Sequence, residues 1–262
     1  MKKQFSNESG VTLIEILIGI VISVLMMAAI FTSYTAVNNT YSQVIDKAKI
    51  SQSGRDIIGM LVRDVRIAGF KYFSDTSKAP TNYNPILITK NSTGCDKLEL
   101  MYGDRNYDPN TTPKYTYVTY KITYECKPSK IIDKKTGINI SAYALYKSKS
   151  KWDGANWQGA STSTDDLLFS DELVVDHIQD LIFNPLNEKG QLINPVPSDL
   201  TGSNKIKVID IAIIMRSQGE FFKKKKPKEV YSLGSKGNTS FNDKFLRESI
   251  LVSAHTRNMV LE

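Results

Sequence analysis

The apolar residues of this chain are concentrated near its N-terminus. No charged side chain occurs between Glu15 and Asp46, and residues 16–31 are nearly all Ile, Leu, Val, Met, Ala and Gly. At about 1.5 Å per residue, roughly 20 such residues cross the hydrocarbon core of a bilayer. The pattern therefore predicts one membrane-spanning helix, and Lys2 and Lys3 before it place the N-terminus on the cytoplasmic side.

The helical pattern continues beyond this segment but becomes amphipathic. Apolar residues recur at the three- and four-residue spacing of one helix face, at Ile58, Leu61, Val62, Val65 and Ala68. Polar residues occupy the opposite face, at Gln52, Asp56, Arg63 and Arg66. Gly69 is a helix stop. We therefore predict a single helix from about Val11 to Ala68, whose second half packs on a globular head. Gly54 and Gly59 weaken its middle by up to about 1 kcal/mol each relative to Ala.

The rest of the chain alternates between apolar and polar residues with period two. The alternation is clearest at 97–102, 115–126 and 207–215, which predicts antiparallel strands with one face exposed to water. Weaker strand patterns occur at 86–89, 143–146, 173–183 and 250–253, with turn-rich segments at 107–110, 133–137 and 159–166. The predicted fold is α+β, with a long N-terminal α-helix packed against an antiparallel β-sheet in one head domain.

Glu15 is a single acidic residue at the start of the apolar run. A carboxylate inside a membrane costs on the order of 2.5–3.5 kcal/mol, so it is expected to have a partner and a function. A cleaved secretory signal peptide is one alternative, but the apolar stretch exceeds the usual length of about 7–15 residues and no small-residue cleavage site follows it. A plain signal anchor is the other alternative, and it does not explain Glu15.

The segment Gly10-Val11-Thr12-Leu13-Ile14-Glu15 resembles the class III leader of type IV pilins and type II secretion pseudopilins. The resemblance implies the pilin fold, and a prepilin peptidase that cuts between Gly10 and Val11 and methylates the new amino terminus of Val11, where the family usually has Phe. It also implies that Glu15 acts in assembly. In a filament its carboxylate can neutralise the new α-amino group of a neighbouring subunit, which removes much of the cost of both charges in lipid.

The same resemblance divides the chain into three parts. Residues 1–10 are a cleaved leader, residues 11–38 are a transmembrane helix that enters the filament core, and residues 39–262 are a periplasmic head that includes the amphipathic half-helix and the sheet. The implied location is the inner membrane, in a single pass with the N-terminus cytoplasmic and the head periplasmic. The subunit is then expected at the pilus tip outside the cell.

Three further segments, 63–70, 206–216 and 246–258, look similar to PilW-type and J-type minor (pseudo)pilins. This implies a minor type IV pilin, a non-catalytic subunit that primes pilus assembly and sits at the filament tip. Its implied partners are the prepilin peptidase, the inner-membrane assembly platform, and other minor pilins and the major pilin through the N-terminal helix. The alternatives are a minor pseudopilin of a type II secretion system and a bitopic membrane adhesin or receptor that is not in a filament.

Cys95 and Cys126 are the two cysteines of the chain. Because the head is expected outside the cytoplasm, where thiols oxidise, we predict a disulfide between them. Closing a loop of about 30 residues stabilises a fold by roughly 3–4 kcal/mol. The alternative is two unpaired buried cysteines, and a metal site would need further ligands.

Basic residues exceed acidic ones by 34 to 27, and the net charge of +7 suits an anionic partner. The densest basic segment follows Phe221 and Phe222 and contains Lys223, Lys224, Lys225, Lys226 and Lys228. We interpret it first as a solvated hairpin loop that keeps a strand edge from pairing wrongly. The second hypothesis is a contact for DNA phosphates or another anionic surface, such as acidic lipid or polysaccharide.

Little in the sequence points to catalysis. His177 and His255 each stand alone in sequence, and the chain has no phosphate-binding loop, dinucleotide fingerprint or nucleophile elbow. Acidic residues gather at Asp165, Asp166, Asp171, Glu172 and Asp176, but their spacing does not match an EF-hand loop, so a solvated acidic face is favoured over a calcium site. We predict no enzyme activity, no cofactor and no metal.

Overall fold

The chain forms two compact units, residues 1–46 and 47–262. The computed structural model describes residues 10–71, 83–92, 94–107, 114–132, 137–160, 167–222, 224–231 and 239–259, together with positions 80, 109, 110, 112 and 233.

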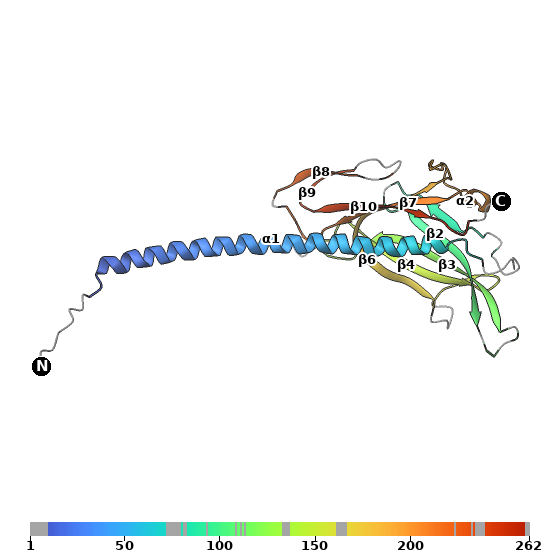
Figure 1. Cartoon of the computed structure of the whole chain (residues 1–262), viewed down its shortest axis with the longest axis horizontal. Coiled ribbons are helices and arrows are strands. Elements are labelled where there is room, and N and C mark those ends of the chain that lie inside the picture. The colour runs from blue at the N-terminus through green and yellow to red at the C-terminus, as the bar shows by residue number, and fades with distance from the viewer. Residues whose placement is uncertain are drawn as a thin grey trace, which may run out of the picture. The chain divides into compact units, whose positions relative to one another are not determined.

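One long helix, α1 (Leu13–Ile67), begins in the first unit and ends in the second (Figure 1). It confirms the helix predicted from the sequence. It also ends at the predicted stop, since Gly69 has a φ of 77°, in the left-handed region that favours glycine. The Gly69 N–H donates to the Met101 carbonyl at 2.9 Å. The Asn258 amide donates to the Arg66 carbonyl at 2.9 Å, which satisfies one acceptor of the last turn.

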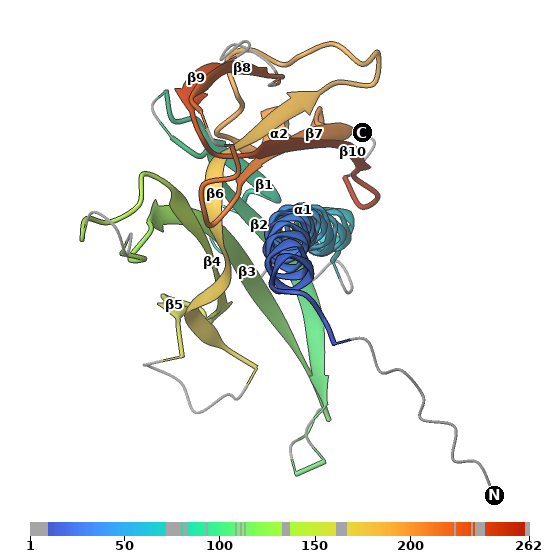
Figure 2. The same ribbon diagram turned by 90° about the vertical axis from the view of Figure 1, so that its left-hand side faces the viewer.

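Residues 47–262 build an antiparallel sheet with the strand order β1-β2-β3-β4-β6-β7-β10, and β5 pairs with β4 (Figure 2). The strands are β1 (Ile86–Thr89), β2 (Lys97–Tyr107), β3 (Tyr115–Pro128), β4 (Tyr143–Trp152), β5 (Trp157–Gln158), β6 (Phe169–Leu186), β7 (Val208–Arg216) and β10 (Arg247–His255). A second sheet pairs β8 (Lys226–Val230) with β9 (Thr239–Asp243), and a short helix α2 (Leu200–Asn204) precedes β7. The predicted α+β fold is confirmed.

The predicted apolar face of α1 meets one face of this sheet. Leu61 and Val65 are fully buried in the same core as Leu100, Ile122 and Tyr124 from β2 and β3. The polar residues predicted on the opposite helix face are exposed, at Gln52, Asp56, Arg63 and Arg66. Each fully buried aliphatic side chain contributes about 1.5–3 kcal/mol relative to an exposed one. This stripe therefore attaches the second part of α1 to the head.

Gly54 has a packing role that its helix propensity alone does not indicate. A Cβ built on Gly54 would lie 2.1 Å from Cδ1 of Ile250 in β10 and 3.2 Å from the sulfur of Met215 in β7. Any larger residue here would force the Ile250 side chain to move, because the helix backbone passes close to it. Gly59, by contrast, would place a Cβ in open space.

Each predicted strand is present in the structure, and several are longer than predicted. β1 matches its predicted bounds, whereas β2, β4 and β6 extend well beyond theirs. The strands β5, β8 and β9 and the helix α2 were missed, because short segments of two to five residues carry little periodicity. Residues 133–136 and 161–166 of the predicted turn-rich segments lie outside the described residues.

The expectation of one wet face is wrong at β7. Ala212 and Ile214, which face away from α1, are as buried as Ile211 and Ile213 on the opposite face. Arg216 lies on that same outer face and donates to the carbonyl of Ser141 at 2.9 Å. The connection between β3 and β4 thus contacts the end of β7. Burial on both faces explains why 208–216 is an almost continuous apolar run.

Candidate functional site

The N-terminal motif begins at the first described residues. Gly10 and Val11 are exposed, and a Cβ added to Gly10 would meet nothing within 4 Å. The peptide bond between them is therefore accessible to a protease. Lys2 and Lys3 lie outside the described residues. Cleavage at this bond and methylation of Val11 stay predictions.

Glu15 forms a reciprocal cap with Thr12 at the start of α1. The backbone N–H and the hydroxyl of Thr12 each donate to Oε2 of Glu15 at 2.9 Å, and the Glu15 N–H donates to Oγ1 of Thr12 at 3.4 Å. This is the capping box, which satisfies two backbone donors that a helix start leaves open. The spacing Thr-x-x-Glu before an apolar run is the sequence signal for this cap. Glu15 thus has a partner within its own chain.

The helix surface that follows Glu15 is apolar and exposed in the isolated chain. Large apolar side chains from Leu13 to Val44 have exposed fractions of 51–78%. An 18-residue window of this helix has a mean hydropathy of 2.8, and none of it is buried within the chain, so it is long and apolar enough to cross a membrane. Its hydroxyl groups bond to carbonyls of the same helix, as Ser23 does to Gly19 at 2.7 Å. This bonding lowers the cost of placing them in lipid.

At its other end, α1 carries a buried carboxylate that contacts the sheet. Asp64 is 2% exposed, and its Oδ2 accepts a hydrogen bond from the Tyr124 hydroxyl at 2.6 Å and an ion pair from Nζ of Lys147 at 2.7 Å. Nε of Arg63 lies 3.3 Å from Oδ1 of Asp64. Burial raises the pKa of Tyr124 above its usual value, and the negative charge of Asp64 raises it further. The tyrosine therefore keeps its proton and donates it in the hydrogen bond to Asp64. Asp64, Tyr124 and Lys147 form a buried polar triad between helix and sheet.

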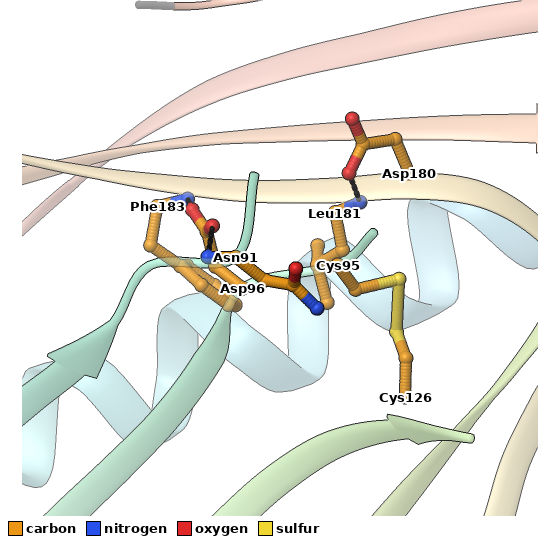
Figure 3. Close-up of a disulfide and its surroundings, with 7 residues drawn as sticks. All are labelled: Asn91, Cys95, Asp96, Cys126, Asp180, Leu181 and Phe183. Atoms are coloured by element: carbon orange, nitrogen blue, oxygen red, sulfur yellow. Dashed lines mark hydrogen bonds between the residues drawn. A yellow bond between two sulfur atoms is a disulfide. The ribbon is translucent and has the colours of Figure 1, made fainter. Parts of the chain in front are cut away.

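The predicted disulfide between Cys95 and Cys126 is present, with a Cα–Cα distance of 5.9 Å. It joins the segment before β2 to β3 (Figure 3). The next residue, Asp96, is fully buried, and its carboxylate accepts the backbone N–H groups of Asn91 and Phe183 at 3.1 and 3.0 Å. Nζ of Lys90 pairs with the same carboxylate at 2.9 Å. The disulfide and Asp96 therefore brace the β1–β2 connection against β3 and β6.

The lysine segment is only partly the loop that was expected. Lys226 and Lys228 lie in β8, while Lys224 and Lys225 precede it and are exposed; Lys223 lies outside the described residues. Nζ of Lys228 sits 3.9 Å from the centre of the Phe222 ring. Burial, and then the charges of Lys226 and Arg247, lower the pKa of Lys228. The arrangement places several cations together at the start of the β8–β9 sheet.

The acidic segment and the histidines form no common site. No cluster of His, Cys, Asp or Glu suited to a metal ion occurs among the described residues, and Asp165 and Asp166 lie outside them. Asp171 pairs with Lys127 of β3 at 2.7 Å. His177 is buried, with a φ of 65° at an irregular point of β6, and burial lowers its pKa, so it is neutral. His255 lies on β10 and is exposed.

No protein-family model matches the chain, and no curated protein matches it in sequence. Among solved structures, a type IV-like pilin from Thermus thermophilus is similar, with 13% sequence identity and a TM-score of 0.47. The similarity covers 80% of this chain and 97% of that one.

Proposed function

We propose that this protein is a type IV pilin-like structural subunit, specifically a minor pilin that primes pilus assembly and sits at the filament tip. The observation that carries the proposal is the N-terminal segment: an exposed Gly10–Val11 bond, a single carboxylate at Glu15, and an apolar first part of α1 whose large side chains from Leu13 to Val44 are exposed. The head has no role in catalysis in this proposal. It is a folded module carried by the helix.

In this proposal the prepilin peptidase removes residues 1–10 and methylates Val11. The helix holds the subunit in the inner membrane in one pass, with the head in the periplasm, until the assembly platform moves it into a filament. There its apolar surface packs against the same helix of the major pilin and of other minor pilins. Van der Waals packing between such helices replaces contacts with lipid.

Glu15 has two available partners at different stages. In the full-length chain it caps its own helix through Thr12. After cleavage each processed subunit carries a positive α-amino group at its N-terminus, and pairing it with the Glu15 carboxylate neutralises two charges in lipid, which the hydrogen bonds to Thr12 do not. Assembly then exchanges an internal cap for a contact between subunits.

The experiment compares Glu15→Gln with Asp56→Asn, which changes an exposed carboxylate further along the same helix. We expect Glu15→Gln to be processed at Gly10 and to fail in filament assembly, while Asp56→Asn behaves as wild type. Mass spectrometry of the membrane-extracted protein reads the N-terminus, and filaments are counted by electron microscopy. A bitopic adhesin or receptor would tolerate Glu15→Gln. An intact leader in cells with an active peptidase would refute the proposal.

The second candidate, a minor pseudopilin of a type II secretion system, has the same N-terminal chemistry. It differs in the machine that the subunit joins. If the protein is a minor pilin, deletion of its gene should reduce the number of surface pili. If it is a pseudopilin, the deletion should instead stop the release of secreted proteins. The two readouts are measured in the same strain.

A further inference from the structure

The outer face of β2–β5, on the side of the sheet opposite α1, carries a row of aromatic side chains. Pairing sets Arg105 opposite Tyr117, Tyr107 opposite Tyr115, and Met101 opposite Lys121. Lys121 lies opposite Ser150, which puts Trp152 on the same face, and Trp152 pairs with Trp157. Tyr124, three positions from Lys121, points to the other face, where it meets Asp64 of α1. We call Tyr107, Tyr115, Tyr117, Trp152 and Trp157 the aromatic row.

Two ring pairs and two cations organise this surface. The rings of Trp152 and Trp157 meet edge to face at 5.4 Å between centroids, with Nζ of Lys121 4.6 Å above the Trp157 ring. The rings of Tyr107 and Tyr115 lie 5.1 Å apart, and the guanidinium of Arg105 is 4.6 Å from the Tyr115 ring. Each aromatic pair thus has a cation against one ring, which fixes a positive charge beside a flat apolar surface.

The aromatic row is open to solvent. Tyr107 is 54% exposed and Tyr115 43% exposed, while Trp152, Trp157 and Lys121 are half-buried. Met101 and Thr119 of the same face are buried, so the row lies beside a covered part of the sheet, and Tyr107 and Tyr115 are its open end. Asp153 marks one end of the row, where two backbone N–H groups and the Gln158 amide bind its carboxylate.

The spacing of the row fits an extended polymer of flat rings. Outward side chains on one strand recur every second residue, about 6.8 Å apart, which is twice the rise of about 3.4 Å per nucleotide along the axis of a stacked duplex. Tyr115 and Tyr117 are two residues apart on β3, and Trp152 follows Lys151, which pairs with Tyr120 of the same strand. The interval matches the unstacked bases of an extended single strand, and it does not match the stacked bases of a duplex.

We propose that the aromatic row binds single-stranded nucleic acid, with bases stacking on the exposed rings and phosphates contacting Lys121 and Arg105. Stacking on aromatic side chains next to cations is the general mode of sequence-tolerant single-strand binding. The net charge of +7 favours an anionic ligand over a neutral one. This site lies on different residues from the lysine segment, and it does not depend on whether the chain enters a pilus.

The test uses the intrinsic fluorescence of the chain, because its two tryptophans both belong to the row. The full-length chain in neutral detergent micelles is titrated with oligothymidylate of about a dozen nucleotides, a common single-strand site size. We expect saturable quenching whose apparent Kd rises steeply with salt. Tyr115→Ala and Lys121→Gln should each weaken binding about tenfold.

Matched controls separate the row from general charge and exposure. Lys189→Gln and Tyr231→Ala make the same chemical changes at exposed positions outside the row and should bind as wild type. Replacing Lys224, Lys225, Lys226 and Lys228 by Gln should also leave the quenching unchanged. The proposal is overturned if oligothymidylate does not quench, if inorganic polyphosphate binds equally well, or if a neutral oligosaccharide quenches and the oligonucleotide does not.

Discussion

The two ends of α1 share one helical geometry and use their apolar residues in opposite ways. Leu25, in the first unit, has 64% of its surface exposed, whereas Leu61, in the second, is fully buried against the sheet. The acidic residues of the two ends also differ in exposure. Glu15 is exposed, whereas Asp64 is buried and contacts Tyr124 and Lys147. An exposed apolar surface of this length calls for lipid or another protein. One end of the helix is therefore packed on the head, and the other end is available for contacts outside the chain.

The largest expected effect is at Asp64. Asp64→Ala leaves Lys147 buried without its counter-ion and Tyr124 without its acceptor, and breaking a buried pair from one side costs about 3–5 kcal/mol. We expect the head to unfold at a markedly lower temperature, measured by near-ultraviolet circular dichroism of the full chain in detergent. Asp56→Ala, exposed on the same helix, should change the free energy of unfolding by about 0.5 kcal/mol or less. Equal effects of the two substitutions would remove the proposed difference between the helix ends.

A second prediction compares substitutions at Leu61 and Leu25. Leu61→Ala should destabilise the head by about 2–5 kcal/mol, because it removes a fully buried side chain and leaves a cavity. Leu25→Ala should leave unfolding of the head unchanged, since this side chain is 64% exposed. The same thermal measurement reports both. A large loss of head stability in Leu25→Ala would show that the first unit also supports the head.

The long elements could be predicted from the sequence because each depends on local periodicity. The apolar stripe of Leu61 and Val65 and the alternation of Ile122 and Tyr124 each follow one element's own spacing. Asp64 was not predicted as a core residue, because its partners lie in β3 and β4 and only the folded sheet brings them to the helix. The burial of Ala212 and Ile214 was missed as well, because alternation along one strand does not show what packs on its outer face.

At the candidate site, the Gly10 to Glu15 motif and the cysteine pair were both visible in the sequence. The cap between Thr12 and Glu15 was also visible as a spacing, but the apolar context directed attention to the membrane. The aromatic row was not visible, because Trp152 and Trp157 come onto the face of Tyr115 only through the pairing of three strands.

A third prediction compares two glycines of α1. Gly54→Ala places a Cβ 2.1 Å from the Ile250 side chain and should destabilise the head by about 1–3 kcal/mol through overpacking. Gly19→Ala adds a methyl group in open space and should leave the head unaffected. Combining Gly54→Ala with Ile250→Val, which removes the clashing Cδ1, should recover part of the loss. A stabilised Gly54→Ala variant would mean that helix propensity, not the contact with β10, governs this position.

The smallest expected effect is at the start of the helix, where Thr12→Ala removes both hydrogen bonds of the Thr12 hydroxyl with Glu15. Losing such a cap costs about 1 kcal/mol. Because the residues of the first turn are exposed, the loss should appear as local fraying and not as a lower unfolding temperature. Hydrogen exchange should speed up about fivefold, the factor for 1 kcal/mol, at the amides of the first turn only. Thr12→Ser, which keeps the hydroxyl, is the matched control and should exchange as wild type. If Thr12→Ala lowered the unfolding temperature of the head as Leu61→Ala does, the two ends of α1 would be coupled, and the contrast between them would fail.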